Sequence, residues 1–228
     1  MVEDKYLAIA ILVGGKSTRF GTDKAVIELV GKPLIVHQID ILSCFDKDVY
    51  LVAHSEEQIF RYKKQIQFPE VVKFLTDDKE ILENTNIFRP MLGVYSALKE
   101  LSKLGFHKVF LLSCDMPLIK PKVIELIIDE GENYDAAIPR WKSGYLEPFF
   151  AMYTIEKALA QAKKIVESQN WGIYNLINKS WNINYVSVEG KIRPMDKNLV
   201  SLMNINGPID LVKFAKFYAK SKEEDFSC

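Results

Sequence analysis

The first residues whose types and spacing could do chemistry lie in the segment 12–24, which directly follows an apolar run at 6–13. The segment holds three glycines and three cations: Gly14, Gly15, Gly21, Lys16, Arg19 and Lys24. Glycines let backbone N–H groups approach phosphate oxygens closely, and the cations neutralise negative charge. The segment therefore predicts a phosphate site. The alternative is a glycine-rich turn with solvated cations.

Two well-known phosphate loops do not fit this segment. A Walker A loop requires a glycine five residues before Gly15, where this chain has Ala10. The dinucleotide fingerprint requires three glycines within six residues, which Gly14, Gly15 and Gly21 do not provide. A longer loop remains, with an arginine between its glycines and Lys24 at its end. Such a loop suits a nucleoside triphosphate.

Asp115 is the strongest single candidate for a metal ligand. It follows the apolar run 108–113 and precedes Pro117, so it is expected at the end of a buried strand. There a divalent ion could bridge its carboxylate to a nucleotide phosphate. The alternative is a turn-forming Asp-x-Pro without a metal. Asn206 is a second candidate ligand, although it is equally well explained as a helix N-cap.

Two further polar side chains, Glu147 and His54, are candidates for contacts at the site. Glu147 precedes Pro148 in an apolar segment, so its carboxylate either contacts a second substrate or forms a salt bridge with a neighbour such as Arg140. His54 follows the apolar run 49–53 and is expected beside the proposed site. The aromatic residues around Trp171 and Tyr174 are assigned to the core.

The elements expected to position these residues alternate between strands and helices. Short continuous apolar runs at 6–13, 49–53, 71–76 and 108–113 are typical of strands buried on both faces of a parallel sheet. Helices are expected between them, at 33–45, 55–65, from Pro90 and from Pro121. We predict a Rossmann-like three-layer α/β/α sandwich with a mainly parallel sheet. Ligands bind such sheets at the carboxyl ends of the strands.

The second half is less regular. The segment 77–88 is expected to be a loop, 135–139 and 146–153 to be strands, and 154–163 and 165–178 to be helices. An edge strand is expected at 182–188, a short apolar segment at 201–205 and a last helix from Gly207. The chain contains no repeat or Gly/Ser linker, so we predict one domain over 1–228, with a frayed tail at 221–228.

Composition limits the classes of partner. The 228 residues are 48% hydrophobic and 26% charged, and 30 basic side chains balance 30 acidic ones. Such a chain has no overall field for nucleic acid or a membrane surface. The cysteines show no Cys-x-x-Cys pair or histidine cluster typical of structural zinc, which predicts a reducing, cytoplasmic setting. The apolar run 6–13 is too short to cross a bilayer.

Four segments together resemble the motifs of molybdenum cofactor guanylyltransferases, in the order found in that family. They are 12–24 followed by Gly31, Lys32, Pro33 and Leu34, then Cys114-Asp115-Met116-Pro117, the segment 147–153 and the segment 204–211. The resemblance extends from about residue 7 to residue 211. It implies a nucleotidyltransferase that uses GTP and Mg²⁺ and transfers GMP to the terminal phosphate of molybdopterin or the molybdenum cofactor, with release of pyrophosphate.

The resemblance also implies roles for individual residues. Leu12, Val13, Gly14 and Gly15 would contact the nucleotide, Arg19 and Lys24 would neutralise phosphates, and Asp115 and Asn206 would hold the metal. His54 stands where the family has an asparagine, and Asp77 or Asp78 stands where it has a guanine-binding aspartate. Proteins that supply the cofactor are candidate contacts.

Three alternatives remain open. The first is a cytidylyltransferase acting on the same cofactor, and the second is a guanylyltransferase acting on phospholactate. The third is a non-catalytic nucleotide-binding module. The choice between GTP and CTP separates the first alternative, and the choice of phosphate acceptor separates the second. The presence of Lys24, Asp115 and Asn206 together argues against the third.

Overall fold

A computed structural model describes residues 5–13, 20–85 and 89–221 of the chain. The strands in chain order are β1 (Lys5–Leu12), β2 (Glu28–Leu29), β3 (Lys32–Pro33), β4 (Asp48–Ala53), β5 (Val72–Thr76), β6 (Phe106–Ser113), β7 (Ala136–Arg140), β8 (Phe150–Thr154) and β9 (Ile183–Ser187). The α-helices are α1 (Leu34–Leu42), α2 (Glu56–Gln65), α3 (Lys79–Thr85), α4 (Pro90–Lys103), α5 (Pro121–Asp129), α6 (Ile155–Ser168) and α7 (Pro208–Ser221). Short helical turns are η1 (Lys24–Val26), η2 (Ile173–Leu176), η3 (Val188–Ile192) and η4 (Val200–Leu202).

Seven of the described strands form one twisted sheet in the order β5-β4-β1-β6-β8-β7-β9. Strand β8 runs antiparallel to both of its neighbours, β6 and β7, whereas the other adjacent pairs are parallel. Helix connections between β1, β4, β5 and β6 allow this parallel pairing. The mainly parallel sheet is as predicted.

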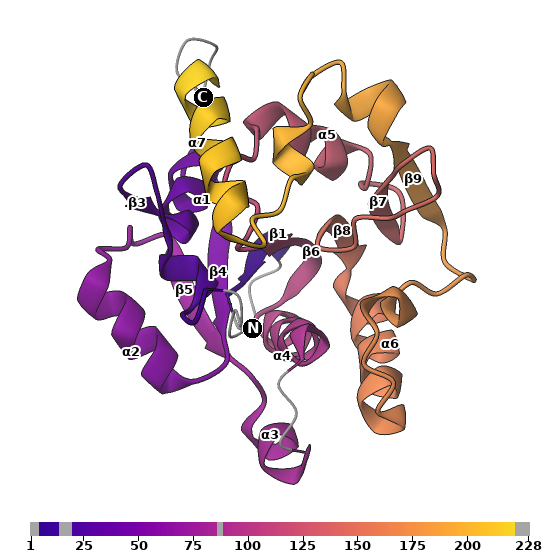
Figure 1. Cartoon of the computed structure of the whole chain (residues 1–228). Coiled ribbons are helices and arrows are strands. Elements are labelled where there is room, and N and C mark those ends of the chain that lie inside the picture. Colours follow the sequence, from indigo (N-terminus) through magenta and orange to yellow (C-terminus); the bar gives the residue numbers. More distant parts are fainter. Residues whose placement is uncertain (1–4, 14–19, 86–88, 222–228) are drawn as a thin grey trace.

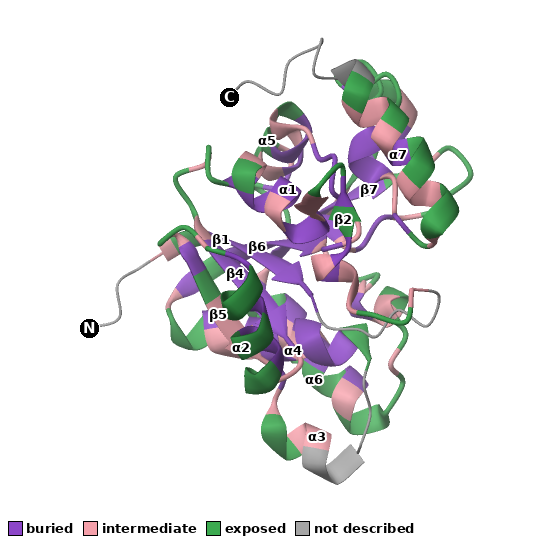
Figure 2. Cartoon of the chain, turned by 60° about the vertical axis from the view of Figure 1, so that its left-hand side comes forward, coloured by how far each residue is buried: buried purple, intermediate pink, exposed green. Residues whose placement is uncertain are grey.

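Helices cover both faces of this sheet (Figure 1). Along β1, Ile9 and Ile11 pack toward the cluster that includes side chains of α1, α2 and α5, whereas Ala8 and Ala10 pack toward α4 and α6. Period-two alternation sends successive side chains to opposite faces, so a strand that is apolar throughout is buried on both. Figure 2 shows the strands as a buried layer between the helices. This arrangement is the predicted three-layer α/β/α sandwich.

A third hydrophobic cluster attaches the C-terminal helix to the N-terminal half. Phe214 of α7 and Ile205 pack with Ile27, Leu29 and Leu34 from the segment around the β2–β3 hairpin. Burial of these side chains favours the association of two regions that are far apart in sequence. The segment before α7 is therefore held next to the start of η1, where Lys24 lies.

Several local predictions are wrong. The segment 77–88 contains helix α3, which begins where the Asp78 carboxylate accepts a hydrogen bond from the Ile81 N–H at 3.3 Å. One helix, α6, replaces the two expected at 154–178, because Gln169 adopts a left-handed conformation with φ of 53° and ends it. The strand expected from residue 146 begins only at Phe150. Of the expected tail, only Ser221 is described, as the last residue of α7.

Within the described residues, no helix has both the length and the apolar composition needed to cross a membrane.

Candidate active site

The carboxyl ends of the central parallel strands meet at one edge of the sheet. Leu12, near the end of β1, is paired with Val52 of β4 and with Ser113 of β6, and Ala53 is paired with Thr76 of β5. The residues that follow these strands therefore lie along the same edge. Strand β8 runs in the opposite direction, with Phe150 paired to Leu112. Its amino-terminal end reaches this edge too and brings Glu147 there.

A cavity of about 400 Å³, here called the site cavity, opens at this edge between β1, β6 and the start of β8. It is lined by Leu12, Lys24, Pro90, Ser113, Cys114, Asp115, Met116, Tyr145, Glu147, Pro148, Phe149, Ile173, Tyr174, Asn204 and Asn206. Lys24, Asp115 and Asn206 come from segments that are distant in sequence, and the fold brings all three into the lining of this cavity.

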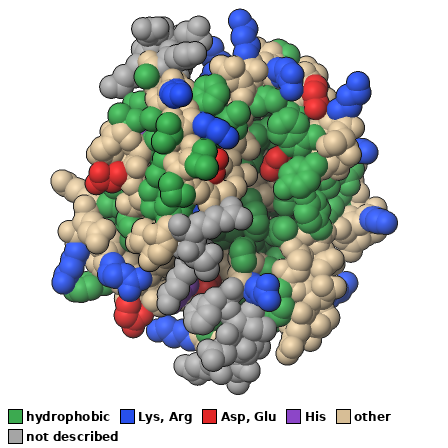
Figure 3. All heavy atoms as spheres, in the orientation of Figure 1, with side chains coloured by type: hydrophobic (Ala, Val, Ile, Leu, Met, Phe, Trp, Pro, Cys, Tyr) green, Lys and Arg blue, Asp and Glu red, His purple; other side chains and the backbone are tan. Residues whose placement is uncertain are grey.

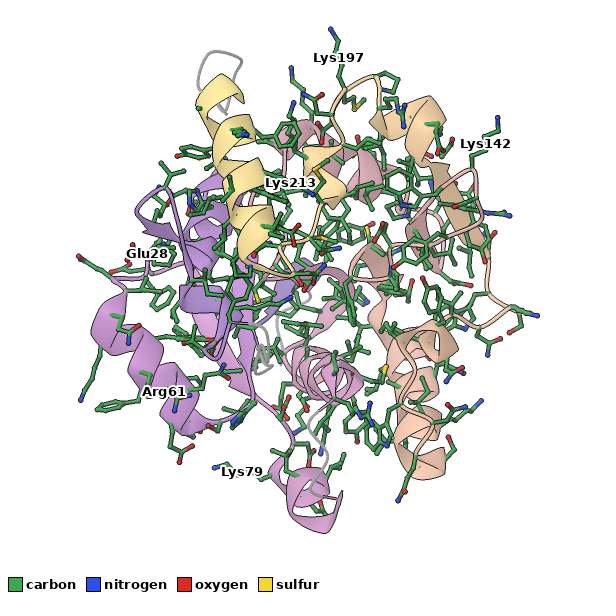
Figure 4. All side chains as sticks on the ribbon, in the orientation of Figure 1. Glu28, Arg61, Lys79, Lys142, Lys197 and Lys213 are labelled. Carbon is green, nitrogen blue, oxygen red and sulfur yellow. The ribbon has the colours of Figure 1, made fainter. Side chains whose placement is uncertain are left out.

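Lys24 joins the two candidate metal ligands. Its Nζ donates a hydrogen bond to Asp115 Oδ2 at 2.9 Å and another to Asn206 Oδ1 at 3.0 Å. Lys142 and Lys197, two of the cations labelled in Figure 4, are exposed and extend outward from the ribbon. Lys24 differs from them because its side chain, 21% exposed, points into the cavity wall. A partly desolvated ammonium is well suited to bind phosphate oxygens.

Backbone contacts fix the turn that presents Asp115. The buried Gln38 amide on α1 donates hydrogen bonds to the carbonyl oxygens of Ser113 and Met116, both at 2.8 Å. The Ile205 N–H donates to the Asp115 carbonyl at 2.8 Å. The last contact ties the Asn206 segment directly to the Asp115 turn. These hydrogen bonds hold the carboxylate and the amide near each other, although 91 residues separate them in sequence.

Asp210 orients the Asn206 segment from the other side. Its Oδ2 accepts hydrogen bonds from the N–H groups of Asn206 at 2.8 Å and Gly207 at 3.0 Å. Helix α7 begins at Pro208, and the Asn206 side chain bonds Lys24. The contact with Lys24 therefore favours a site role for Asn206 over the helix-capping alternative.

Two side chains of α2 hold both flanks of the glycine-rich segment. Tyr62 Oη contacts the Val13 carbonyl at 3.3 Å and Asp23 Oδ2 at 2.7 Å. Gln58 Nε2 contacts the same two acceptors at 3.2 Å and 2.5 Å. Burial and the Asp23 charge raise the pKa of Tyr62, so its hydroxyl stays a donor. Val13 precedes the segment and Asp23 lies next to Lys24, so one pair of side chains fixes both ends.

The donor set around Asp115 fits a hard divalent cation. Asp115 Oδ1 is buried and has no hydrogen-bond partner among the described residues, and the Asn206 amide oxygen shares the Lys24 ammonium with Asp115 Oδ2. The described residues contain no group of three or more His, Cys, Asp or Glu side chains able to hold a metal. Magnesium bound with a nucleotide needs only one or two protein ligands, because phosphate oxygens and water supply the others.

The cavity wall offers a thiol but no activated nucleophile among its described residues. Cys114 is a free, buried cysteine. Burial, followed by the charges of Asp115 and Asp23, raises its pKa well above the usual value. A neutral thiol is a poor nucleophile. The arrangement therefore suits direct transfer between two bound substrates, without a covalent enzyme intermediate.

Asp77 and Asp78 differ sharply in their surroundings. The Asp78 carboxylate bonds Lys99 Nζ at 2.5 Å. Burial alone would raise the pKa of Asp78, but hydrogen bonds from Lys99 and Ile81 lower it below the usual value. Asp77 is 8% exposed, and burial raises the pKa of its carboxyl to about 7. The Asp78 carboxylate is thus occupied by contacts within the fold, whereas the Asp77 carboxyl can still accept hydrogen bonds from a ligand.

Asp77 also lies next to open space. A hollow of about 1070 Å³ runs along the edge strand β5 and α2, and Asp77 lines one end of it. On its other side Asp77 packs closely against Gly93 in the first turn of α4, because a Cβ there would lie only 3.4 Å from Asp77 Oδ1. This hollow includes neither Lys24 nor Asp115, so Asp77 flanks the site cavity and is not part of its wall.

Glu147 lies in the opposite wall, at the start of β8. It is 7% exposed, and Trp141 Nε1 donates to its Oε1 at 2.7 Å. The salt bridge to Arg140 considered from the sequence is not the contact found, because the Arg140 guanidinium packs over the Tyr185 ring. Burial raises the pKa of Glu147, the Trp141 hydrogen bond opposes that shift, and the Asp115 charge adds to it.

Other predicted residues have different outcomes. Gly14, Gly15 and Arg19 lie outside the described residues. Val13 donates its N–H to the Val52 carbonyl at 3.1 Å and directs its own carbonyl toward α2, so both backbone groups are engaged in the fold. His54 does not appear in the lining of the site cavity. Its backbone N–H donates to Gln58 Oε1 at 2.8 Å. Their nucleotide contacts stay predictions.

Sequence reasoning missed several residues of the site. Gln58 and Tyr62 carry no motif, and their only signal is a shared face of α2. Tyr174 was assigned to the core, but it is 45% exposed and lines the site cavity. Tyr145 and Phe149 were not singled out, and both line the same wall.

A family model described as the MobA-like NTP transferase domain matches residues 9–179 of the chain. The chain belongs to the MobA-like NTP transferase family. It is a nucleotidyltransferase by this membership, and the matched region contains Lys24, Asp115 and Glu147.

Individual relatives agree with this assignment. A probable molybdenum cofactor guanylyltransferase of Pyrococcus horikoshii is 36% identical over 187 residues, which cover 80% of this chain and 87% of that protein. Its counterpart from Thermococcus sibiricus is 32% identical over 206 residues, which cover 89% and 94%. The crystal structure of molybdopterin-guanine dinucleotide biosynthesis protein A from Archaeoglobus fulgidus matches with a TM-score of 0.75 and 28% identity, covering 93% of this chain and 99% of that one.

Proposed function

We propose that this chain transfers GMP from GTP to the terminal phosphate of molybdopterin or the molybdenum cofactor. In this reaction an oxygen of the acceptor phosphate bonds to the α-phosphorus of GTP, the bond from that phosphorus to the bridging oxygen breaks, and pyrophosphate leaves. The names of the similar proteins from Thermococcus sibiricus and Pyrococcus horikoshii support this substrate pair. The observation that carries the proposal is the contact of Lys24 with both Asp115 and Asn206.

Lys24 would supply positive charge to the triphosphate. A pentavalent transition state at phosphorus concentrates negative charge on oxygens, and a pre-positioned ammonium stabilises that charge. Arg19 would add a second cation. Lys24 is held on both sides, by Asp115 and by Asn206, so it needs little reorganisation when the nucleotide arrives.

Asp115 and Asn206 would hold a divalent ion, for which we propose Mg²⁺. Among the described residues, Asp115 Oδ1, which has no hydrogen-bond partner there, and the amide oxygen of Asn206 are the ligands available. When bound, the ion would supply further positive charge to the phosphates. Gln38 and Ile205 keep the Asp115 turn in place through backbone hydrogen bonds. The protein's own contribution is thus to fix the orientation of the two oxygen ligands.

Asp77 would select guanine. The Watson–Crick edge of guanine presents a ring N–H and an amino group side by side, and an ionised carboxylate accepts from both. Cytosine has an amino group but a ring nitrogen that only accepts, so it cannot form the same pair. Lys99 already occupies Asp78, which favours Asp77 for this role. The difference between the hydrogen-bonding edges of guanine and cytosine supports GTP over CTP as the substrate, and it argues against the cytidylyltransferase alternative.

We also propose that the reaction takes place in the cytoplasm, that the whole chain forms one domain, and that the protein contacts the proteins that supply the cofactor.

The test of the proposed function is pyrophosphate release from GTP and from CTP with Mg²⁺, with and without molybdopterin. The proposal predicts release that requires both GTP and molybdopterin. Release from CTP would favour the cytidylyltransferase, release with phospholactate in place of molybdopterin would favour the second alternative, and binding without turnover would favour a non-catalytic module.

A further inference from the structure

The strand order divides the catalytic edge of the sheet into two sides. Along the order β5-β4-β1-β6-β8, Asp77 follows β5, Asp115 follows β6 and Glu147 precedes β8. The phosphate-binding residues Lys24 and Asp115 are therefore flanked by Asp77 on one side and by Glu147 on the other. If the base of GTP binds on the Asp77 side, the Glu147 side is left for the acceptor.

The wall on the Glu147 side is aromatic and apolar. Tyr145, Pro148, Phe149, Ile173 and Tyr174 line this part of the site cavity. Figure 3 shows hydrophobic side chains gathered on this face of the molecule. The Tyr145 and Tyr174 rings meet edge to face with centroids 6.1 Å apart, and Tyr174 Oη donates to the Leu146 carbonyl at 3.1 Å. A triphosphate forms no favourable contacts with an apolar, aromatic wall, whereas a flat heterocycle can stack on it.

Glu147 is the polar group set into this wall. Trp141 holds one carboxylate oxygen, and no described residue donates a hydrogen bond to the other, Oε2. Glu147 is 7% exposed, and Oε2 is not one of the buried side-chain oxygens that lack a partner, so this oxygen is open to the site cavity that Glu147 lines. No lysine or arginine of the described chain forms a salt bridge with it. A ligand that donates hydrogen bonds would satisfy the remaining oxygen.

We infer that Glu147, Phe149 and Tyr174 form the subsite that binds the heterocyclic ring of the acceptor. The carboxylate accepts hydrogen bonds from a ring N–H and an adjacent exocyclic amine, and the aromatic side chains stack on the ring. The edge of a pterin that carries the 2-amino and 4-oxo groups presents this pair of donors. The inference rests on the proposed function, which gives the acceptor a pterin ring. Glu147 is then a specificity residue for the acceptor, as Asp77 is for the base.

The first test compares two probes on the wild-type chain, with GTP bound. A pterin monophosphate and its lumazine counterpart, which has an oxo group in place of the 2-amino group, are titrated by their intrinsic fluorescence. The subsite predicts that the pterin binds about tenfold more tightly, because the lumazine oxygen faces a carboxylate and offers no donor. Equal affinity of the two probes would overturn the inference without any substitution in the chain.

The second test uses Glu147→Gln, which keeps the shape of the side chain and an oxygen for Trp141. The variant is expected to raise the KM for molybdopterin about tenfold, to leave the KM for GTP unchanged and to lose the preference for pterin over lumazine. Glu167→Gln, an exposed position on α6, is the matched control and should behave as wild type. An unchanged molybdopterin KM with the preference retained would overturn the inference.

The two proposals fail in different ways. If wild-type chain binds GTP but does not transfer GMP to molybdopterin, the proposed function is wrong. If wild type transfers GMP to molybdopterin and Glu147→Gln does so with the same KM, the function stands and the subsite is wrong. Unchanged GTP affinity in Glu147→Gln shows that the variant is folded. A loss of GTP affinity in the variant would instead assign Glu147 to the nucleotide side and overturn the inference.

Discussion

The Lys24 ammonium lies 2.9 Å from Asp115 Oδ2, and the same nitrogen lies 3.0 Å from Asn206 Oδ1. These three residues come from the N-terminal loop, the end of β6 and the segment before α7. Their meeting point is the end of the sheet at which parallel α/β proteins bind ligands. A cation of the chain is thus placed between the two oxygen ligands that we assign to the metal.

The first prediction concerns the carboxylate charge at this point. Asp115→Asn keeps the shape of the side chain and removes its charge, so transfer should slow by ~10²-fold or more. The temperature of unfolding should change little, because the backbone contacts of Gln38 and Ile205 that hold the turn remain. Glu100→Gln, which removes the acidic partner of an exposed ion pair with Lys103 on α4, is the control. If the kcat of Asp115→Asn were near the wild-type value, the assignment of Asp115 to the catalytic site would be wrong.

The second prediction concerns the pair on α2. Tyr62→Phe removes the hydroxyl that contacts Asp23 at 2.7 Å and the Val13 carbonyl at 3.3 Å. Loss of a hydrogen bond to a charged group costs ~1.5–3 kcal/mol. We expect part of this cost to weaken GTP binding about tenfold, because Asp23 sets the position of Lys24. Tyr134→Phe, at the opposite end of the sheet, is the control. Calorimetry measures the GTP affinity. If Tyr62→Phe and wild type bound GTP equally well, the contact of Tyr62 with Asp23 and Val13 would contribute to folding alone.

The third prediction concerns the pH dependence of stability. Burial raises the pKa of Asp77 to about 7 in the folded chain, whereas an exposed aspartate titrates near ~3.9. Between these values the folded chain binds more protons, so the contribution of Asp77 to the free energy of unfolding decreases as pH rises toward 7. Asp77→Asn should therefore gain stability relative to wild type between pH 5 and pH 8. Urea unfolding at both pH values measures the gain.

Asp78→Asn is the matched control for that experiment. Hydrogen bonds from Lys99 and Ile81 keep the pKa of Asp78 low, so its substitution should alter stability by a similar amount at pH 5 and pH 8. If Asp77→Asn also shows a constant difference at the two pH values, Asp77 is ionised throughout this range and the assigned burial effect is wrong.

The fourth prediction links the same carboxyl to the base. Acceptance of two hydrogen bonds from guanine requires ionised Asp77, so GTP affinity should increase as pH rises through about 7, the pKa of this carboxyl in the folded chain. The Asp77→Asn variant should lack this part of the increase while keeping the part that comes from titration of the phosphates. Calorimetric Kd values at several pH values provide the comparison. If GTP affinity changed with pH in the same way in wild type and in Asp77→Asn, Asp77 would not take part in binding the base.

Much of the fold could be predicted from the sequence because its strongest signals are local. The unbroken apolar run of β1 indicated a strand buried on both faces, and the residues from Ala8 to Ile11 are fully buried. The start of the segment 146–153 was predicted wrongly, because an apolar run does not reveal a turn: the Phe150 N–H donates to the Glu147 carbonyl at 3.1 Å, and the strand begins only at Phe150.

Residues of the site cavity that a motif marks could be singled out from the sequence, whereas those that only the fold brings there could not. Lys24, Asp115 and Asn206 each follow a pattern visible in the sequence. Tyr174 enters the cavity because Gln169 ends α6 in a left-handed conformation, and Gln58 is important because Val13 and Asp23 come within its reach. Such contacts depend on tertiary structure, which one sequence does not display.

The assignment of Lys24 to the catalytic site is tested most directly by acceptor-dependent release of pyrophosphate from Mg·GTP. The wild-type protein is compared with Lys24→Met, and Lys103→Met is the control for loss of an exposed cation. We expect release from GTP only when molybdopterin is present, a ~10²-fold or larger loss of rate in Lys24→Met, and a wild-type rate in Lys103→Met. Release from GTP at equal rates in wild type and Lys24→Met would show that Lys24 takes no part in the transfer.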